Sequence, residues 1–319
     1  MHGNKTLITE LILLGFEELH DLQIFLFLVF LVIYILTIVA NFLTFLLIVT
    51  DQHLHTPMYF FLGNLSCLEM LYSSTILPRL LSGLLTGKKV ISFKQCLTQL
   101  YFFGCLIGTE CYLLCVMSYD RFLAICKPFH YATLMNEKLC IQLAAGSWIN
   151  GIVFTSMYLA FVLQLWYCGP YEIDHFFCDS LSLIEISCNN TSFVKQLSVI
   201  LSFMFTFPPF LLTVLSYVYI IAAILKIPST AGRQKAFSTC SSHLIVVSLF
   251  YGSLIIVYII PKTETVRDVN KIFSLLYTVL PPILNPLVYS LRNMDVREAL
   301  RKAVGKILEG QFVNQTLKV

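Results

Sequence analysis

Charged side chains are scarce in this chain. Asp, Glu, Lys and Arg make up 12% of its 319 residues, whereas 57% are hydrophobic and the mean hydropathy is +0.80. A soluble domain carries about 25% charged residues, because its surface must face water. The shortage excludes a cytosolic enzyme, a nucleic-acid-binding protein and a disordered chain, and it predicts that most apolar side chains face lipid.

Glycine and proline are also few, at 14 and 11 residues, beside 26 Phe and 16 Tyr. Collagen-like and low-complexity proteins need far more of both, so these classes are excluded. The net charge of +3 is too small to indicate a polyanionic partner. The N-terminal stretch lacks the basic and apolar regions of a cleavable signal peptide, so we expect the first apolar segment to act as an uncleaved anchor.

Seven apolar segments are each long enough, at about 20 residues or more, to cross a hydrocarbon layer as a helix. They are Leu22–Thr50, Met58–Pro78, Leu97–Tyr119, Leu139–Trp166, Gln196–Leu225, Ala236–Pro261 and Ile272–Leu291. They are too long for the strands of a membrane barrel. The predicted fold class is therefore an all-α membrane protein, a seven-transmembrane helix bundle. We expect one domain over 1–319, with an extracellular tail (1–21), the bundle (22–291) and a cytoplasmic part (292–319).

The cytoplasmic part has an apolar stripe with helical spacing and basic residues around it. The stripe consists of Val296, Leu300, Ala303, Val304, Ile307 and Leu308. This pattern predicts a short amphipathic eighth helix that lies on membrane lipid at the inner leaflet.

The orientation of the bundle follows from glycosylation sequons and from a slight excess of Lys and Arg on the opposite side. Sequons at Asn4, Asn189 and Asn190 all fall on the side of the N-terminus. We therefore expect a multi-pass protein of the plasma membrane with an extracellular N-terminus and with glycans at these positions.

Four of the 11 cysteines lie in the expected outer loops, which face an oxidising space. They are Cys96, Cys168, Cys178 and Cys188. Four such cysteines indicate two disulfides, and their spacing leaves three pairings open. A zinc site that uses His175 and Cys178 is the competing interpretation, although a single nearby histidine gives it little support.

Two acids, Glu69 and Glu110, are the charged exceptions inside the apolar segments. A carboxylate in mid-bilayer costs about 2.5–3.5 kcal/mol, so both should face the bundle interior. They would hold a sodium ion, share a proton, or hydrogen-bond as neutral acids to Ser66, Asn41 or Asn285. No other cofactor is indicated. A proton-coupled transporter or channel would use such acids too.

Two short motifs lie at the ends of apolar segments. Asp120 and Arg121 form an adjacent acid–base pair where the third segment meets the cytoplasm. In the seventh segment, Asn285 precedes Pro286, which removes a backbone hydrogen bond and favours a kink, and Tyr289 follows one turn later. Each motif alone is a modest signal, and together with seven spans they are a strong one.

With these motifs the sequence resembles the rhodopsin-like G-protein-coupled receptors, and within them the tetrapod-type class of vertebrate odorant receptors. The resemblance covers nearly the whole chain. It is carried by Leu54–Leu62 (LHTPMYFFL), Met117–Cys126 (MSYDRFLAIC), Lys235–Leu244 (KAFSTCSSHL), Phe250–Gly252 (FYG) and Pro282–Asn293 (PILNPLVYSLRN). It implies a receptor, not an enzyme, that binds a small volatile molecule inside the bundle. It also implies activation of a stimulatory, olfactory-type heterotrimeric G protein that raises cyclic AMP, in the cilia of olfactory neurons.

The resemblance also implies roles for individual residues at the cytoplasmic end. Arg121 would be paired with Asp120 at rest and freed to meet the G protein on activation. Tyr217 and Tyr289 would then move toward Arg121, with Asn285 and Pro286 shaping the kinked seventh helix.

On the outer side the resemblance implies disulfides between Cys96 and Cys178 and between Cys168 and Cys188. In the middle, Glu69 and Glu110 fall where the family places an acidic or sodium site. Two departures from the family pattern occur there. Glu69 replaces the usual Asp and leaves sodium binding in question, and Ala40 replaces the Gly before Asn41.

A ligand pocket is expected where helical faces of the third, fifth, sixth and seventh spans meet. Its predicted residues are Phe103, Gly104, Ile107, Gly108, Ser202, Phe205, Tyr251, Leu254, Ile255, Tyr258 and Thr278. They would form an apolar cup with a few hydroxyls, which suits a small neutral ligand. Simple helix packing explains any one of them equally well. Besides the transporter, a rhodopsin-like receptor of non-olfactory function is the remaining alternative.

Overall fold

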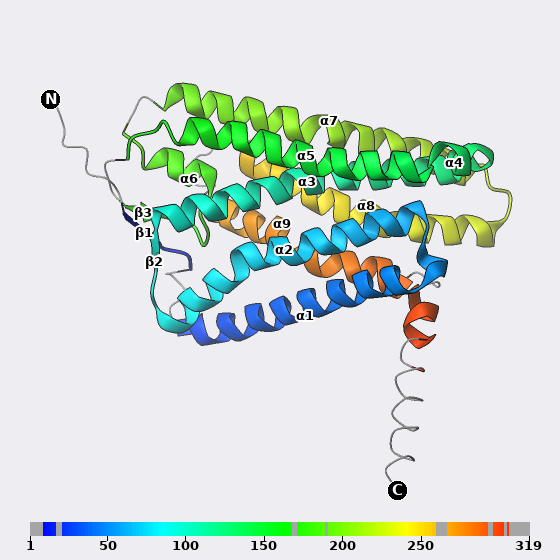
Figure 1. Ribbon diagram of the computed structural model, residues 1–319, viewed down its shortest axis with the longest axis horizontal. Coiled ribbons are helices and arrows are strands. Elements are labelled where there is room, and N and C mark those ends of the chain that lie inside the picture. Colours follow the sequence, from blue (N-terminus) through cyan, green and yellow to red (C-terminus); the bar gives the residue numbers. More distant parts are fainter. Residues whose placement is uncertain are drawn as a thin grey trace, which may run out of the picture.

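The computed structural model is a bundle of long helices that run side by side (Figure 1). It describes residues 9–16, 21–167, 171–188, 191–259, 267–292, 296–302 and 305. The long helices are α1 (Gln23–Thr50), α2 (Pro57–Thr86), α3 (Phe93–Cys126), α5 (Glu137–Val162), α7 (Ser192–Leu225), α8 (Thr230–Tyr258) and α9 (Arg267–Arg292). The predicted seven-helix membrane bundle is confirmed.

The spans that the sequence predicts correspond to these helices, with differences at their ends. Six helices are long and apolar enough to cross a membrane, and α8 contributes a shorter apolar stretch, His243–Tyr258. Its first turns carry the polar side chains of Arg233 and Gln234, which suit the aqueous side. Conversely, α5 ends at Val162, four residues before the predicted end at Trp166, whose side chain is exposed.

Short elements connect the long helices and close the two ends of the bundle. On the cytoplasmic side they are η2 (Gln52–Leu54) and α4 (Pro128–Leu134). On the outer side they are β1 (Glu10–Leu13), β2 (Val90–Ser92), β3 (Glu172–Ile173) and α6 (Ser180–Glu185). None of the three strands was expected from the sequence.

Local sequence signals explain several helix ends. At the start of α2, Thr56 takes the N-cap position in an extended conformation and Pro57 follows in the first turn, although the Thr56 side chain makes no capping hydrogen bond. A capping box starts α3, where Ser92 Oγ accepts from the Gln95 N–H and Gln95 Oε1 accepts from the Ser92 N–H. Gly87 ends α2 in the left-handed conformation that other residues rarely adopt.

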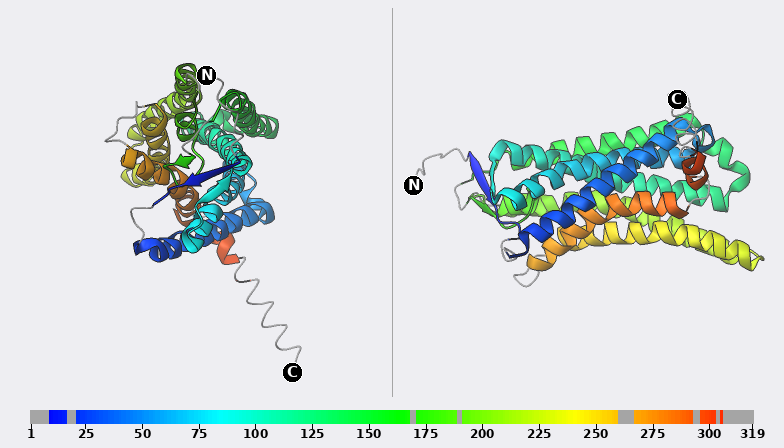
Figure 2. Two further views of the ribbon diagram at one scale, coloured as in Figure 1. Left: turned by 90° about the vertical axis from the view of Figure 1, so that its left-hand side faces the viewer. Right: turned by 90° about the horizontal axis from the view of Figure 1, so that it is seen from below.

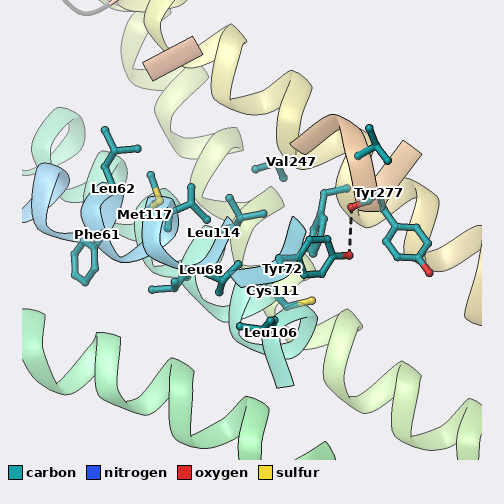
Figure 3. Close-up of a cluster of buried hydrophobic side chains, with 14 of the residues drawn as sticks. Phe61, Leu62, Leu68, Tyr72, Leu106, Cys111, Leu114, Met117, Val247 and Tyr277 are labelled. Atoms are coloured by element: carbon teal, nitrogen blue, oxygen red, sulfur yellow. Dashed lines mark hydrogen bonds between the residues drawn. The ribbon is translucent and has the colours of Figure 1, made fainter. Parts of the chain in front are cut away.

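The main core lies where α2, α3, α8 and α9 meet. Figure 3 shows its middle, where Tyr72 of α2 donates a hydrogen bond to the backbone oxygen of Tyr277 in α9 (3.5 Å). Leu68, Leu114 and Val247 pack around this contact and are buried. The outward face of α1 is different, because large side chains such as Ile24 (77% exposed) are left for lipid. The molecule is therefore packed with mainly apolar side chains inside, and it is apolar on its membrane-facing surface as well.

The outer end is covered by a three-stranded sheet with the order β2-β1-β3. Strand β1 pairs antiparallel with β2 and parallel with β3, and Figure 2 (left) shows it crossing the end of the bundle. Its inward side chains Leu11 and Leu13 are buried with Cys96, Cys178 and neighbouring apolar residues. The N-terminal segment and residues 171–188 therefore cover the outer ends of the helices, and we call them the lid.

The predicted eighth helix is present where it is described, over residues 296–302. Val296 and Ala299 are buried against the main core, whereas Leu300 is exposed on the other side. Glu298 and Lys302 form an exposed ion pair one turn apart (2.9 Å). The rest of the predicted stripe, including Ala303 and Val304, lies outside the described residues.

Candidate functional site

A cavity of about 120 Å³ lies in the outer half of the bundle, between α3, α5, α7 and α8. No charged side chain is among the described residues that line it. Those residues are Leu100, Phe103, Gly104, Ile107, Gly108, Cys111, Phe154, Thr155, Tyr158, Ser180, Ser198, Leu201, Ser202, Phe205, Thr206, Leu254 and Tyr258. The cavity is largely apolar with several hydroxyl groups, which is the usual lining of a small-molecule site.

The structure brings together eight of the eleven residues that the sequence predicts for the pocket. These are Phe103, Gly104, Ile107, Gly108, Ser202, Phe205, Leu254 and Tyr258. Tyr251, Ile255 and Thr278 do not line the cavity. The Tyr251 hydroxyl instead donates to the Cys111 backbone oxygen in α3 (2.5 Å), and Thr278 donates to the backbone of its own helix. These two side chains are thus used for packing.

Sequence reasoning missed the contribution of α5, which supplies Phe154, Thr155 and Tyr158. It also missed part of α7, where Ser198 and Thr206 join Ser202 on one side of the cavity. A signal for them exists, because hydroxyl residues recur on α7 at 198, 202 and 206, four residues apart and hence on one face.

Two glycines of α3 allow the neighbouring helices to approach the cavity. A Cβ at Gly104 would lie 2.7 Å from Thr155 Cγ2, and one at Gly108 would lie 2.6 Å from Phe205 Cε1. The Phe205 ring therefore lies directly on Gly108, and it also contacts the Phe154 ring with a centroid distance of 3.7 Å. These aromatic rings form the inner end of the cavity.

The lid above the cavity is tied to three elements. Cys178 forms a disulfide with Cys96 at the start of α3. The next residue, Asp179, is buried and caps α6 through the Leu181 and Ser182 N–H groups. Its other oxygen accepts a hydrogen bond from the Tyr258 hydroxyl of α8 (3.1 Å).

This chain of hydrogen bonds continues into α9, because the Tyr258 and Tyr277 hydroxyls are 2.8 Å apart. Farther out, Lys271 of α9 pairs with Asp174 of the lid (2.5 Å). The lid, α8 and α9 are therefore connected by polar contacts beside the cavity.

Removing the Tyr258 hydroxyl (Tyr258→Phe) should loosen this connection, because the buried Asp179 loses a hydrogen bond. We expect the free energy of unfolding to fall by about 1–3 kcal/mol, as measured by thermal unfolding in lipid nanodiscs. The matched control is Tyr34→Phe, whose exposed hydrogen bond to Ser74 (3.1 Å) should contribute almost nothing. Equal effects of both substitutions would contradict the role given to the Asp179 contact.

The two intramembrane acids meet in the centre of the bundle and are fully buried. Of the partners considered from the sequence, Asn285 is the one used, since its side-chain amide donates to Glu69 Oε1 (2.5 Å). Asn41 donates instead to the backbone oxygens of Thr37 and Pro282. One oxygen of Glu69 and both oxygens of Glu110 accept no hydrogen bond within the described part of the chain.

Those free oxygens suit a cation or a shared proton, because two adjacent buried carboxylates cannot both stay charged without a positive partner. A sodium ion prefers oxygen ligands of this kind.

The structure does not support the alternative zinc site at His175 and Cys178. Cys178 is bonded to Cys96, and the described residues contain no group of three His, Cys, Asp or Glu that would hold a metal.

At the cytoplasmic end, Asp120 is buried and held by two donors. Arg121 binds its Oδ2 (2.6 Å), and the hydroxyl of Tyr131 in α4 donates to its Oδ1 (2.7 Å). Burial, and then the hydrogen bond to Asp120, raise the pKa of Tyr131, so this phenol stays protonated and continues to donate. Asp120 and Arg121 are thus paired in this structure, and α4 supports the pair.

The other residues predicted to take part in the switch lie on the neighbouring helices. Tyr217 of α7 is buried and hydrogen-bonded to His243 of α8. Pro286 lies inside α9 next to Asn285. The side chain of Tyr289 is outside the described residues, as are Asn4, Asn189, Asn190 and Cys168, so the expected glycans and the second disulfide are not placed. Cys188 is disulfide-bonded.

Comparison with known proteins identifies the family. The sequence profile described as "Olfactory receptor" matches residues 30–307. Olfactory receptor 6N1 of Homo sapiens is 44% identical over 305 residues, which cover 96% of this chain and 98% of that protein. Olfactory receptor 6F1 of Homo sapiens is 47% identical, covering 94% and 97%, and olfactory receptor 6Z7 of Mus musculus is 46% identical, covering 95% and 97%. Together with the multi-span bundle, this family match makes the chain a multi-pass receptor of the plasma membrane, not an enzyme. The chain belongs to the olfactory receptor family.

Proposed function

We propose that this receptor binds a small, neutral, volatile organic molecule in the cavity between α3, α5, α7 and α8. Binding would activate a stimulatory, olfactory-type G protein and raise cyclic AMP in the cilia of olfactory neurons. The observation that carries the proposal is the cavity itself, with its largely apolar walls and its hydroxyl groups.

The size of the cavity supports a small ligand. At about 120 Å³ it is similar to an engineered cavity of about 150 Å³ that takes up benzene, so a ligand about the size of benzene fits without large rearrangement, and a longer one requires the lining side chains to move. A charged group would lose its hydration there without gaining an opposite charge, which favours neutral molecules. Ser198, Ser202 and Thr155 would serve a single carbonyl or hydroxyl group of the ligand.

The cytoplasmic contacts support coupling to a G protein. Arg121 is held by the buried Asp120, and Asp120 is in turn held by Tyr131, so the contacts restrain Arg121 at the mouth of the bundle. A ligand that shifts α7 and α8 would favour the state in which this restraint is broken. The central acids Glu69 and Glu110 would bind sodium or share a proton in the resting state.

The direct test is a panel of aliphatic alcohols, aldehydes and ketones of six to ten carbons, with cyclic AMP as the response in cells that express the receptor. Arg121→Ala should silence every response while surface staining stays unchanged, because Arg121 lies about 15 Å along α3 from Cys111, the nearest cavity residue of that helix, at 1.5 Å per residue. Normal signalling by Arg121→Ala at equal surface density would refute the switch. Ion conductance without any G protein would favour a channel instead.

Weakening the hold on Arg121 should have the opposite effect. Tyr131→Phe removes one hydrogen bond from Asp120, and Asp120→Asn removes the charge, so ligand-free cyclic AMP should rise in both, by about 2- to 10-fold if the restraint contributes about 0.5–1.5 kcal/mol. Surface staining must accompany the measurement, and Tyr119→Phe, whose ring is exposed, is the control. Unchanged basal signalling in both variants at normal surface density would show that the pair is no restraint.

A further inference from the structure

The cavity borders the lipid-facing surface of α7. In the outer half of α7, four large side chains are 41–57% exposed, as expected for side chains that face lipid. These are Val199, Ile200, Phe203 and Met204. Interleaved with them, Leu201, Ser202 and Phe205 line the cavity and are themselves partly exposed. One short stretch of helix therefore separates the cavity from the bilayer.

Two contacts connect α7 to α5 on either side of this stretch, and the helices lie side by side in Figure 1. At the outer end, the Ser198 hydroxyl donates to the Tyr158 hydroxyl (3.4 Å). Deeper in the bundle, the rings of Phe154 and Phe205 are in contact. We call the part of the wall framed by Phe154, Tyr158, Ser198 and Phe205 the lateral window.

The lateral window is bordered by side chains that can move. Along the helix axes its frame extends four residues on α5 and seven on α7, or about 6 Å and 10 Å at 1.5 Å per residue. The side chains between the frame residues are Thr155 on α5 and Leu201 and Ser202 on α7, and Gly104, which has none, lies behind Thr155. A rotamer change of Leu201 is a fast local motion and would widen the lateral window.

The outer end of the cavity is closed more firmly. Phe103, Phe177 and Leu183 are at most 3% exposed beneath the lid, and the disulfide between Cys96 and Cys178 holds the lid on α3. The hydrogen bonds from Asp179 through Tyr258 to Tyr277 would have to break for a ligand to pass there. A ligand that enters from water must therefore break hydrogen bonds in a segment held by a disulfide, whereas a ligand that enters from lipid must only displace side chains that can change rotamer.

We propose that the odorant reaches the cavity from the outer leaflet of the membrane, through the lateral window between α5 and α7. This inference rests on the proposed function of the cavity. It implies that the receptor samples the concentration of odorant dissolved in lipid, and that it selects neutral molecules at the entrance because a charged group in the hydrocarbon layer is costly.

The test uses the full-length receptor in lipid nanodiscs, with Ser202→Cys as a reporter inside the cavity. Two probes are compared at pH 8.5, neutral N-phenylmaleimide, which dissolves in lipid, and a cationic methanethiosulfonate, which stays in water. Peptide mass spectrometry follows modification of the new cysteine, and material unfolded in detergent shows its full reactivity. For each reagent, the rate with the folded receptor is divided by its rate with the unfolded material. We expect this ratio to be at least about tenfold smaller for the cationic reagent than for N-phenylmaleimide.

Variants in the same background separate the two routes. Leu201→Trp, which fills the lateral window, should slow N-phenylmaleimide about tenfold, whereas Ile200→Trp on the lipid face of α7 should not. Tyr258→Phe, which weakens the lid, should leave the rate unchanged. Equal rates for both reagents, no effect of Leu201→Trp, no reaction with N-phenylmaleimide, or acceleration by Tyr258→Phe would each overturn the proposal.

Because no odorant is used, this result is independent of whether the panel above yields an agonist. With the most potent agonist of that panel, Leu201→Trp should slow the onset and the washout of the response by the same factor. Because Leu201 also lines the cavity, the rates of onset and washout, and not the half-maximal concentration, report the entrance. A shifted half-maximal concentration with unchanged onset would make Leu201 a binding residue only.

Discussion

Replacing Cys96 with serine (Cys96→Ser) is expected to remove the receptor from the cell surface. Its disulfide partner, Cys178, is 82 residues away, so the bond closes a long loop in the unfolded chain. A crosslink of this length stabilises the folded state by about 4–5 kcal/mol, which is a large share of the stability of most proteins. The same bond holds the lid on α3, so any remaining surface receptor should respond poorly.

The measurement is surface staining together with thermal unfolding of the purified protein. Cys67→Ser is the matched control, because Cys67 is a free cysteine that is only partly buried in α2. Its effect should stay below about 1 kcal/mol, since it exchanges one small side chain for another. A Cys96→Ser receptor with normal surface level and normal thermal stability would show that the disulfide is dispensable.

Gly151→Ala should be nearly as damaging, although it adds a single methyl group. Gly151 of α5 faces α3, and a Cβ there would lie 2.3 Å from the Cys105 backbone oxygen and 2.5 Å from Thr109 Oγ1. Overpacking costs about 1–3 kcal/mol where side chains can yield, and a backbone oxygen yields less, so we expect about 3 kcal/mol or more. Separating α3 from α5 would also distort the cavity, which both helices line.

Gly146→Ala on the same helix provides the control, because a Cβ at Gly146 meets no atom within 4 Å. It should be neutral or slightly stabilising, since alanine favours a helix more than glycine does. The two variants are compared by thermal unfolding in nanodiscs and by surface staining. If they unfold at the same temperature, α3 and α5 are less tightly packed than the structure shows.

The sequence by itself determined the class of fold and the family. Long segments that lie in lipid and carry almost no charge must form helices, because every backbone group must be hydrogen-bonded within its own segment. The seven long helices were therefore predictable, apart from their ends, whereas the short helices α4 and α6 were not. The motifs around Asp120 and Pro286 were readable because they are contiguous in the chain, and the structure keeps Asp120 and Arg121 paired.

Only the tertiary structure decided which faces of the helices meet. Periodicity identifies a helical face but does not fix the rotation of the helix in the bundle, because lipid-facing and core-facing positions are both apolar here. For that reason Tyr251 was predicted to line the pocket but packs against α3, whereas Thr155 and Tyr158 of α5 were missed and line it.

The lid shows the same limit for contacts between distant segments. Strand β1 lies near the N-terminus, but its partners are residues 90–92 and 172–173. A strand of four residues has too little local preference for its partners to be predicted from the sequence. The hydrogen bonds from Asp179 to Tyr258 and from Asn285 to Glu69 likewise join residues far apart in the sequence. Such pairs become visible only when packing fixes the separation between helices, and they are the contacts that shape the cavity and its entrance.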